Sequence, residues 1–114
     1  MATGLPINLT AADMPLNGES ADGVTLPFTV KNTDTTGWTF SVTLWRSNQQ
    51  GTGPTGDSIG SGSVANTPGS PDSSLVLTVD SAVTTPYAGV PLWAVMRKTN
   101  DVPRTLAKGK WVLR

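Results

Sequence analysis

The side chains that could do chemistry in this sequence are few, because its 114 residues include no histidine and no cysteine. Nucleophilic catalysis of the Ser-His-Asp and Cys-His kinds, zinc ligation by these residues and thiol redox chemistry are therefore excluded. The eight carboxylates that remain stand singly in predicted turns, so no pair shares a strand face where burial could raise the pKa of one of them. The sequence predicts a protein that is not an enzyme and has no catalytic residues.

Two short sequence motifs resemble those of ligand-binding loops. The segment Gly51–Gly56 matches Gly-x-Gly-x-x-Gly after a predicted strand, but a phosphate-binding loop of this kind needs a helix behind it, and more Gly, Ser and Pro follow. Asn32 and Asp34 could contribute to a calcium loop, but the carboxylates are too few, and capping of a turn by their own side chains explains both residues. No cofactor and no metal are predicted.

The four tryptophans carry the clearest signals for binding. The alternation of apolar residues places Trp38 and Trp111 on the inward faces of strands, where they would fill the core. Trp45 projects from a polar face between Thr43 and Ser47, where an aromatic ring serves recognition of a protein or a sugar. Trp93 lies in a strand that is apolar on both sides, so its place in the core or at an interface is left open.

Charge is unevenly distributed along the chain. Residues 1–96 carry seven acidic and two basic residues, a net charge of −5, and residues 97–114 carry six basic residues and one acidic residue, a net charge of +5. This division suits head-to-tail contacts between copies or an acidic partner, and a solvated basic hairpin is the alternative. Because the body is acidic and the total charge is zero, nucleic acid is not expected as a partner. The predicted interface residues are Trp45, Trp93, Arg97, Lys98, Arg104, Lys108 and Lys110.

The elements that must position these residues are strands. The chain has 17 Thr and 10 Ser, a composition that favours strands and turns over helices. Alternating patterns predict strands at 24–31, 38–45, 75–80, 90–97 and 105–113, with the first two and the last two forming antiparallel hairpins. The strand at 90–97 is apolar on both faces and is expected to be central, whereas Pro27 marks an edge or bulge. One helical turn is expected at Thr10–Asp13.

These patterns predict a single all-β domain over residues 1–114, an antiparallel immunoglobulin-like β-sandwich of about seven strands, with a small barrel as the alternative. Residues 1–21 are expected to form an N-terminal arm. Residues 48–72 are rich in Gly, Ser and Pro and are expected to form a long flexible loop, in which Ile59 and Val64 mark a weak edge strand.

The segment Asp22–Asp34, with the aromatic and aliphatic strand after it, resembles the opening of immunoglobulin-like modules in tailed-phage virion proteins. The N-terminal domains of baseplate upper proteins and tail-fibre proteins are of this type. Their ending is similar to the turn Tyr87–Gly89, the strand Leu92–Arg97, the turn Thr99–Asp101 and the segment Arg104–Leu113. The resemblance covers roughly residues 22–47 and 75–114. Two features depart from the pattern. Modules of this type often continue into a coiled coil or a receptor-binding head, and the glycine-rich insertion of this sequence is longer than expected for them.

The resemblance implies a non-enzymatic structural or adaptor protein of a bacteriophage virion, in the tail, baseplate, fibre or capsid-associated, assembled in the host cytoplasm. Its partners would be other virion proteins and further copies of itself. No binding residue of the family transfers to a position here.

Two other functions stay open. A carbohydrate-binding module would stack Trp45, and Trp93 with it, against sugar rings. An enzyme would need two neighbouring carboxylates in a concave pocket. A membrane partner is not expected, because no apolar run approaches the roughly 20 residues that span a bilayer and Met1–Leu9 lacks the basic start of a secretory signal.

Overall fold

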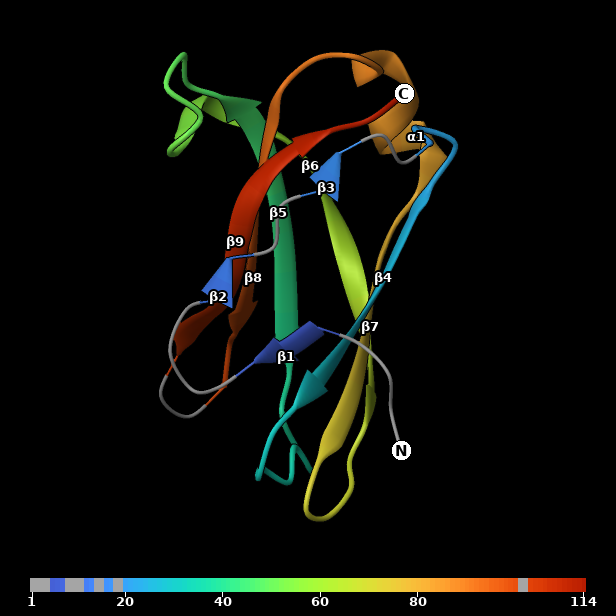
Figure 1. Ribbon diagram of the computed structural model, residues 1–114, viewed down its shortest axis with the longest axis vertical. Helices are drawn as coiled ribbons and strands as arrows, with labels where there is room; N and C mark the ends of the chain where they lie inside the picture. The colour runs from blue at the N-terminus through green and yellow to red at the C-terminus, as the bar shows by residue number, and fades with distance from the viewer. Residues whose placement is uncertain (1–4, 8–11, 14–15, 18–19, 101–102) are drawn as a thin grey trace.

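The computed structural model describes residues 5–7, 12–13, 16–17, 20–100 and 103–114, and its regular secondary structure over these residues is mostly β-strand (Figure 1). The strands are β1 (Leu5–Ile7), β2 (Ala12–Asp13), β3 (Leu16–Asn17), β4 (Val24–Val30), β5 (Phe40–Ser47), β6 (Pro54–Thr67), β7 (Ser73–Val79), β8 (Leu92–Lys98) and β9 (Arg104–Val112). The helix α1 (Ser81–Thr84) and a 3-10 turn (Thr85–Tyr87) connect β7 to β8. The predicted all-β class is confirmed.

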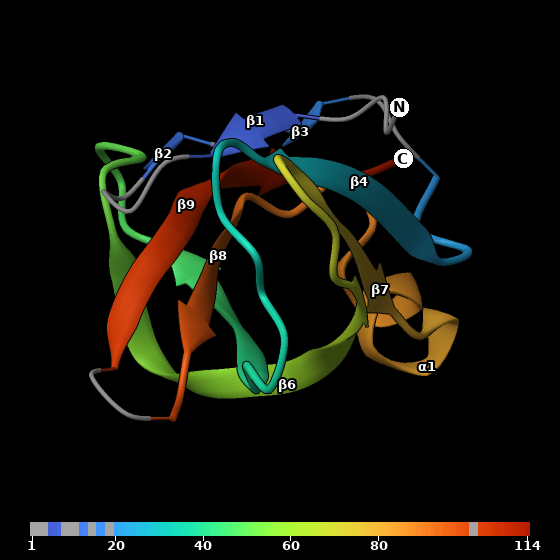
Figure 2. The same cartoon turned by 90° about the horizontal axis from the view of Figure 1, so that it is seen from below.

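The six long strands form one curled antiparallel sheet in the order β4-β7-β6-β5-β8-β9. Seen along the strands, the sheet bends round until β4 and β9 face each other across a gap, and β1, β2 and β3 lie over that gap (Figure 2). The short strands pair in parallel with the two edges, β1 with β4 and both β2 and β3 with β9. The N-terminal segment therefore bridges the two edges of the sheet.

The core lies inside the curl, and alternation along each strand builds it. In β7, Leu75, Leu77 and Val79 are fully buried, while Thr78 between them is exposed. Trp111 of β9 is also fully buried, as its place in the pattern predicts. The prediction that β8 is central is confirmed, because it pairs with β5 on one side and with β9 on the other.

The segment expected to be a flexible loop contains the longest strand instead. β6 is neither irregular nor an edge strand, since its first half pairs with β5 and its second half with β7. The change of partner takes place at Gly62, which is paired with Val42, and the next residue, Ser63, is paired with Thr78. The sequence pattern did not indicate this strand clearly, because its glycine and serine residues lack the bulky apolar side chains that mark a strand.

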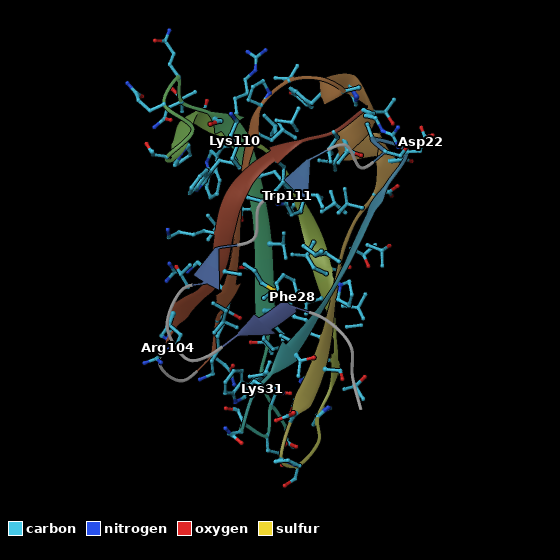
Figure 3. All side chains as sticks on the ribbon, viewed as in Figure 1. Asp22, Phe28, Lys31, Arg104, Lys110 and Trp111 are labelled. Atoms are coloured by element: carbon cyan, nitrogen blue, oxygen red, sulfur yellow. The ribbon has the colours of Figure 1, made fainter. Side chains whose placement is uncertain are left out.

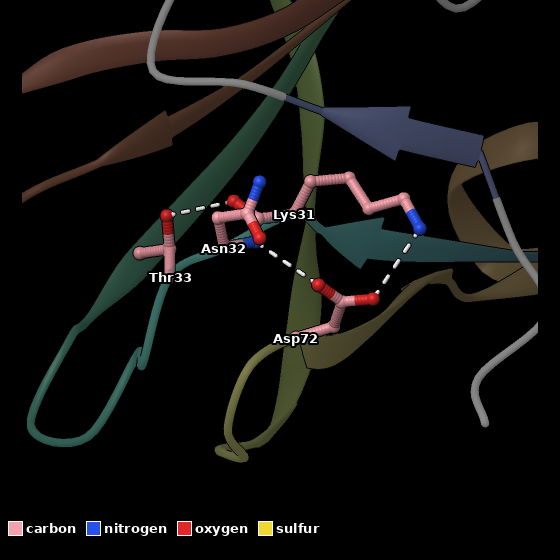
Figure 4. A network of polar contacts seen from close by, with 4 residues as sticks. All are labelled: Lys31, Asn32, Thr33 and Asp72. Carbon is pink, nitrogen blue, oxygen red and sulfur yellow. Dashed lines mark hydrogen bonds and ion pairs between the residues drawn. The ribbon is translucent and has the colours of Figure 1, made fainter.

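The hairpin expected between residues 24–31 and 38–45 is also wrong. β4 pairs with β7, and β5 pairs with β6 and β8. The connection from β4 to β5 crosses one end of the curl, where polar groups hold it to β7. The Asp72 carboxylate accepts a hydrogen bond from the Asn32 N–H at 3.0 Å and pairs with the Lys31 Nζ at 3.3 Å (Figure 4). The Ser73 hydroxyl accepts a further bond from the Thr35 N–H at 3.0 Å.

Helical structure lies elsewhere than expected. Ala12 and Asp13, half of the expected helical turn, form β2, and Thr10 and Ala11 lie outside the described residues. The helix α1 follows Asp80, whose carboxylate accepts a hydrogen bond from the Ala82 N–H at 3.5 Å, an N-cap arrangement. None of the described helices has the length and apolar character needed to cross a membrane.

Candidate protein interface

The outer face of β5, β8 and β9 brings together five of the seven predicted interface residues. The register aligns Trp45 with Trp93 and Trp93 with Lys110, so these three form one row across the strands. Lys108 lies in the next row, beside Val95, and Arg97 in the row after it. We call this surface the aromatic–basic face, made of Trp45, Trp93, Arg97, Lys108 and Lys110.

The two tryptophans of this face differ in exposure. Trp45 is half-buried, whereas Trp93 is only 8% exposed. Trp93 has a row neighbour on each side, and the Lys108 Nζ lies 5.9 Å from the centre of its ring. Cation–π attraction of this kind holds the lysine stem over the aromatic ring. Trp45 is thus the accessible aromatic group of the face. Trp93, aligned with Trp45 on the next strand, is buried between its row neighbours.

The charged residues on the three strands of this face are all basic, and Asp13 of β2 is aligned with Lys108 at its edge. Arg97 and Lys110 are exposed, and Arg97 donates a hydrogen bond to the Thr105 hydroxyl at 3.0 Å. Neither β5, β8 nor β9 contains an aspartate or a glutamate. Tryptophan and arginine are residue types enriched at the anchoring positions of protein interfaces, whereas lysine is depleted there and suits the polar rim.

The other two predicted interface residues are not part of this face. Lys98 points to the inner side of the sheet, where it is 8% exposed and its Nζ lies 4.8 Å from the centre of the Trp38 ring. Arg104 is paired with Lys98 at the start of β9, and Figure 3 shows it far from Lys110, toward the opposite end of that strand. Trp38 is half-buried just before β5, so it covers the end of the core and does not fill its centre.

One group near the face could not be found from the alternation of residues. Arg46 and Lys110 line the same surface hollow of about 350 Å³, together with Asn48 and Gln49 of the following turn. Simple alternation after Leu44 places Arg46 on the inner side of the sheet. The register between β5 and β8 continues without a shift and pairs Arg46 with the buried Leu92, yet Arg46 is exposed, one residue before the end of β5. The polar residues Asn48 and Gln49 directly after the strand were the available sequence signal that the strand ends here, where Arg46 is exposed.

The remaining motifs have structural explanations. Gly51–Gly56 forms the turn into β6, with no helix after it, so the structure supports no dinucleotide site there. The Asp34 carboxylate accepts hydrogen bonds from the Thr36 hydroxyl at 2.6 Å and from the Thr36 N–H at 3.0 Å. These bonds lower the pKa of Asp34, the hydroxyl contributing most. Among the described residues, no three potential metal ligands gather in one place.

No protein-family model matches this chain, and no curated protein matches it in sequence.

Proposed function

We propose that this chain is a non-enzymatic structural or adaptor protein of a bacteriophage virion, and that it binds other proteins through the aromatic–basic face. The observation that carries the proposal is the gathering of Trp45, Trp93 and three basic residues on one face of three adjacent strands. The absence of His and Cys from the sequence supports the non-enzymatic part. The virion setting rests on the resemblance of residues 22–47 and 75–114 to phage modules.

In this proposal the sheet is a variant of the immunoglobulin-like sandwich. One layer consists of β4, β7 and the second half of β6, and the other consists of β5, β8, β9 and the first half of β6. Because β6 belongs to both layers, the two layers are joined along one side of the sandwich. The outer face of the second layer is the surface offered to partners.

Site-specific photo-crosslinking tests the proposed function. A photoreactive phenylalanine analogue replaces Thr43, which lies half-buried in the row beside Trp45, and a control carries it at Ala65, exposed on the second half of β6. After irradiation of assembling particles, we expect a covalent adduct with a particle protein from position 43 and none from position 65. The Trp45→Ala change should reduce the adduct at least about tenfold, because anchoring aromatics contribute about 2 kcal/mol or more.

Two results would contradict the proposal. Equal adducts from positions 43 and 65 would mean that the face has no special role. Loss of folding in Trp45→Ala, measured by circular dichroism, would mean that this ring belongs to the core.

A second candidate is binding of a glycan by the same face, favoured by the half-buried Trp45 in line with the Thr43 and Ser41 side chains. Sugar rings stack on such aromatic side chains, and neighbouring hydroxyls add hydrogen bonds. Titration of the intrinsic tryptophan fluorescence with polysaccharides tests this candidate. A change that disappears in Trp45→Ala would support it, and a constant signal across a broad set of glycans would refute it.

A further inference from the structure

A second, acidic hollow lies where β4, β6, β7 and α1 meet. It has a volume of about 590 Å³ and is open to solvent. Asp22 and Asp80 line it, with the hydroxyls of Ser61, Ser63 and Thr78 between them, and no basic residue is among its lining residues. Both carboxylate-bearing residues are exposed, and neither contacts a basic side chain within the described part of the chain.

The hollow lined by Arg46 and Lys110 has the opposite character. Amide groups of Asn48 and Gln49 complete it, and no acidic residue lines it. Arg46 and Lys110 have no carboxylate partner among the described residues. The Lys110 stem lies close to Gly51, since a Cβ at that position would be 3.0 Å from the Lys110 Cδ. Lys110 belongs to this hollow and to the aromatic–basic face, so the two are continuous.

The two hollows cannot meet within one molecule. Figure 3 shows Lys110 and Asp22 near the same end of the molecule but on opposite flanks. Opposite charges on opposite flanks attract a neighbouring molecule in a side-by-side arrangement, in which the basic surface of one copy meets the acidic surface of the next. Such a contact joins two different surfaces, and its repetition gives a ring or an open chain.

We propose that a second copy of this chain docks on the basic hollow, and that it presents the Asp22–Asp80 hollow there. This inference rests on the proposed function, because it names the partner of the aromatic–basic face. Arg46 and Lys110 would receive the Asp22 and Asp80 carboxylates of the neighbouring copy, with Trp45 anchoring the adjoining part of the contact.

Complementation between two charge variants tests the inference. The basic variant is R46E with K110E. The acidic variant is D22K with D80N, where asparagine keeps the N-cap of α1. The matched control is D57K, which reverses an exposed charge on β6 outside both hollows. Circular dichroism and thermal melting establish that each variant is folded, and light scattering coupled to size exclusion gives the mass over a wide range of concentration.

For the unaltered chain and for D57K, we expect a mass that rises with concentration and falls toward one chain in high salt. Each double variant should associate at least about tenfold more weakly, since like charges then face each other. An equimolar mixture of the two double variants should form a species of two chains, because each variant keeps the surface that the other has lost.

Three results would overturn the inference. A mass of one chain for the unaltered protein at every protein and salt concentration would refute docking of a second copy. The photo-crosslink at Thr43 would then still test the proposed function separately. Double variants that associate like the unaltered chain would place the contact elsewhere. Weak association of each variant without recovery in the mixture would exclude a contact between these two surfaces.

Discussion

Asp72 shows how one side chain fixes the path of a long connection. Its carboxylate accepts a hydrogen bond from the Asn32 N–H and pairs with Lys31, so it links the start of β7 to the end of β4. Asn32 has a positive φ of 53°, a conformation that asparagine adopts more readily than most residues. The hydrogen bond from Asn32, with a smaller contribution from Lys31, lowers the pKa of Asp72.

This lowered pKa predicts a dependence of stability on pH. A carboxylate whose pKa is lower in the folded state stabilises the fold above its ordinary pKa of about 3.9, and the contribution is lost as the pH falls through the lowered value. Asp72→Asn should therefore be less stable than the unaltered chain at pH 7, and the difference should shrink toward pH 2. Urea unfolding at pH 7, 4 and 2 measures this, with Asp57→Asn as the exposed control. A difference that stays constant over this range would show that charge plays no part.

At the scale of elements, β6 is the strand that joins the two halves of the curled sheet, because it pairs with β5 and then with β7. It is 14 residues long and changes partners at Gly62. A Cβ at Gly62 would lie 2.5 Å from the Thr78 carbonyl oxygen and 2.9 Å from the Val79 Cγ2. The backbone of β7 therefore approaches β6 at the bend more closely than any side chain would permit.

Gly62→Ala should destabilise the protein by about 1–3 kcal/mol, the usual cost of forcing an extra carbon into a packed site. Gly53→Ala is the matched control, because a Cβ there would lie at an ordinary 3.6 Å from the Asn48 Nδ2. Chemical denaturation of both variants gives the two free energies of unfolding. Equal values would mean that the bend can widen without cost.

Strands with bulky alternating residues could be predicted from the sequence, and those without them could not. The strands containing Leu75 and Trp111 were found at nearly their observed bounds, because burial on one face of a strand leaves a period of two. β6 was predicted only as a weak edge strand within a flexible loop, because glycine and serine are frequent in it. The pairing of β4 with β7 was missed because adjacency in sequence favoured a hairpin. For the candidate site, Trp45 was placed correctly on the outer face. Arg46 was missed because alternation assigns it to the inner face and does not show that β5 ends one residue later, where this side chain is exposed.

At the scale of the whole molecule, the N-terminal segment pairs with part of each of the two edges of the sheet. β1 lies along β4, and β3 lies along β9, where Leu16 is paired with Trp111. Leu16 is partly buried against the core. Unpaired sheet edges are templates for association with other chains, so this segment protects the fold from aggregation.

Deletion of residues 1–17 should lower the melting temperature by at least about 5 °C, the shift that roughly 1 kcal/mol produces in a domain of this size. It should also make the protein aggregate as its concentration rises, because the edges of β4 and β9 are then open. Differential scanning calorimetry and light scattering measure the two effects, and deletion of residues 1–4, which precede β1, is the control. An unchanged melting temperature in the longer deletion would show that the bridging segment adds no stability.

The pairing of β3 with β9 has a consequence for synthesis on the ribosome. β9 follows all the other described strands in the chain, and the Ala21 N–H donates a hydrogen bond to the Arg114 carbonyl oxygen at 2.8 Å. The partner of β3 is therefore made only after the other five long strands of the sheet. The core cannot close until β9 has left the ribosome, and a chain that lacks β9 leaves β8 as an open edge of the sheet.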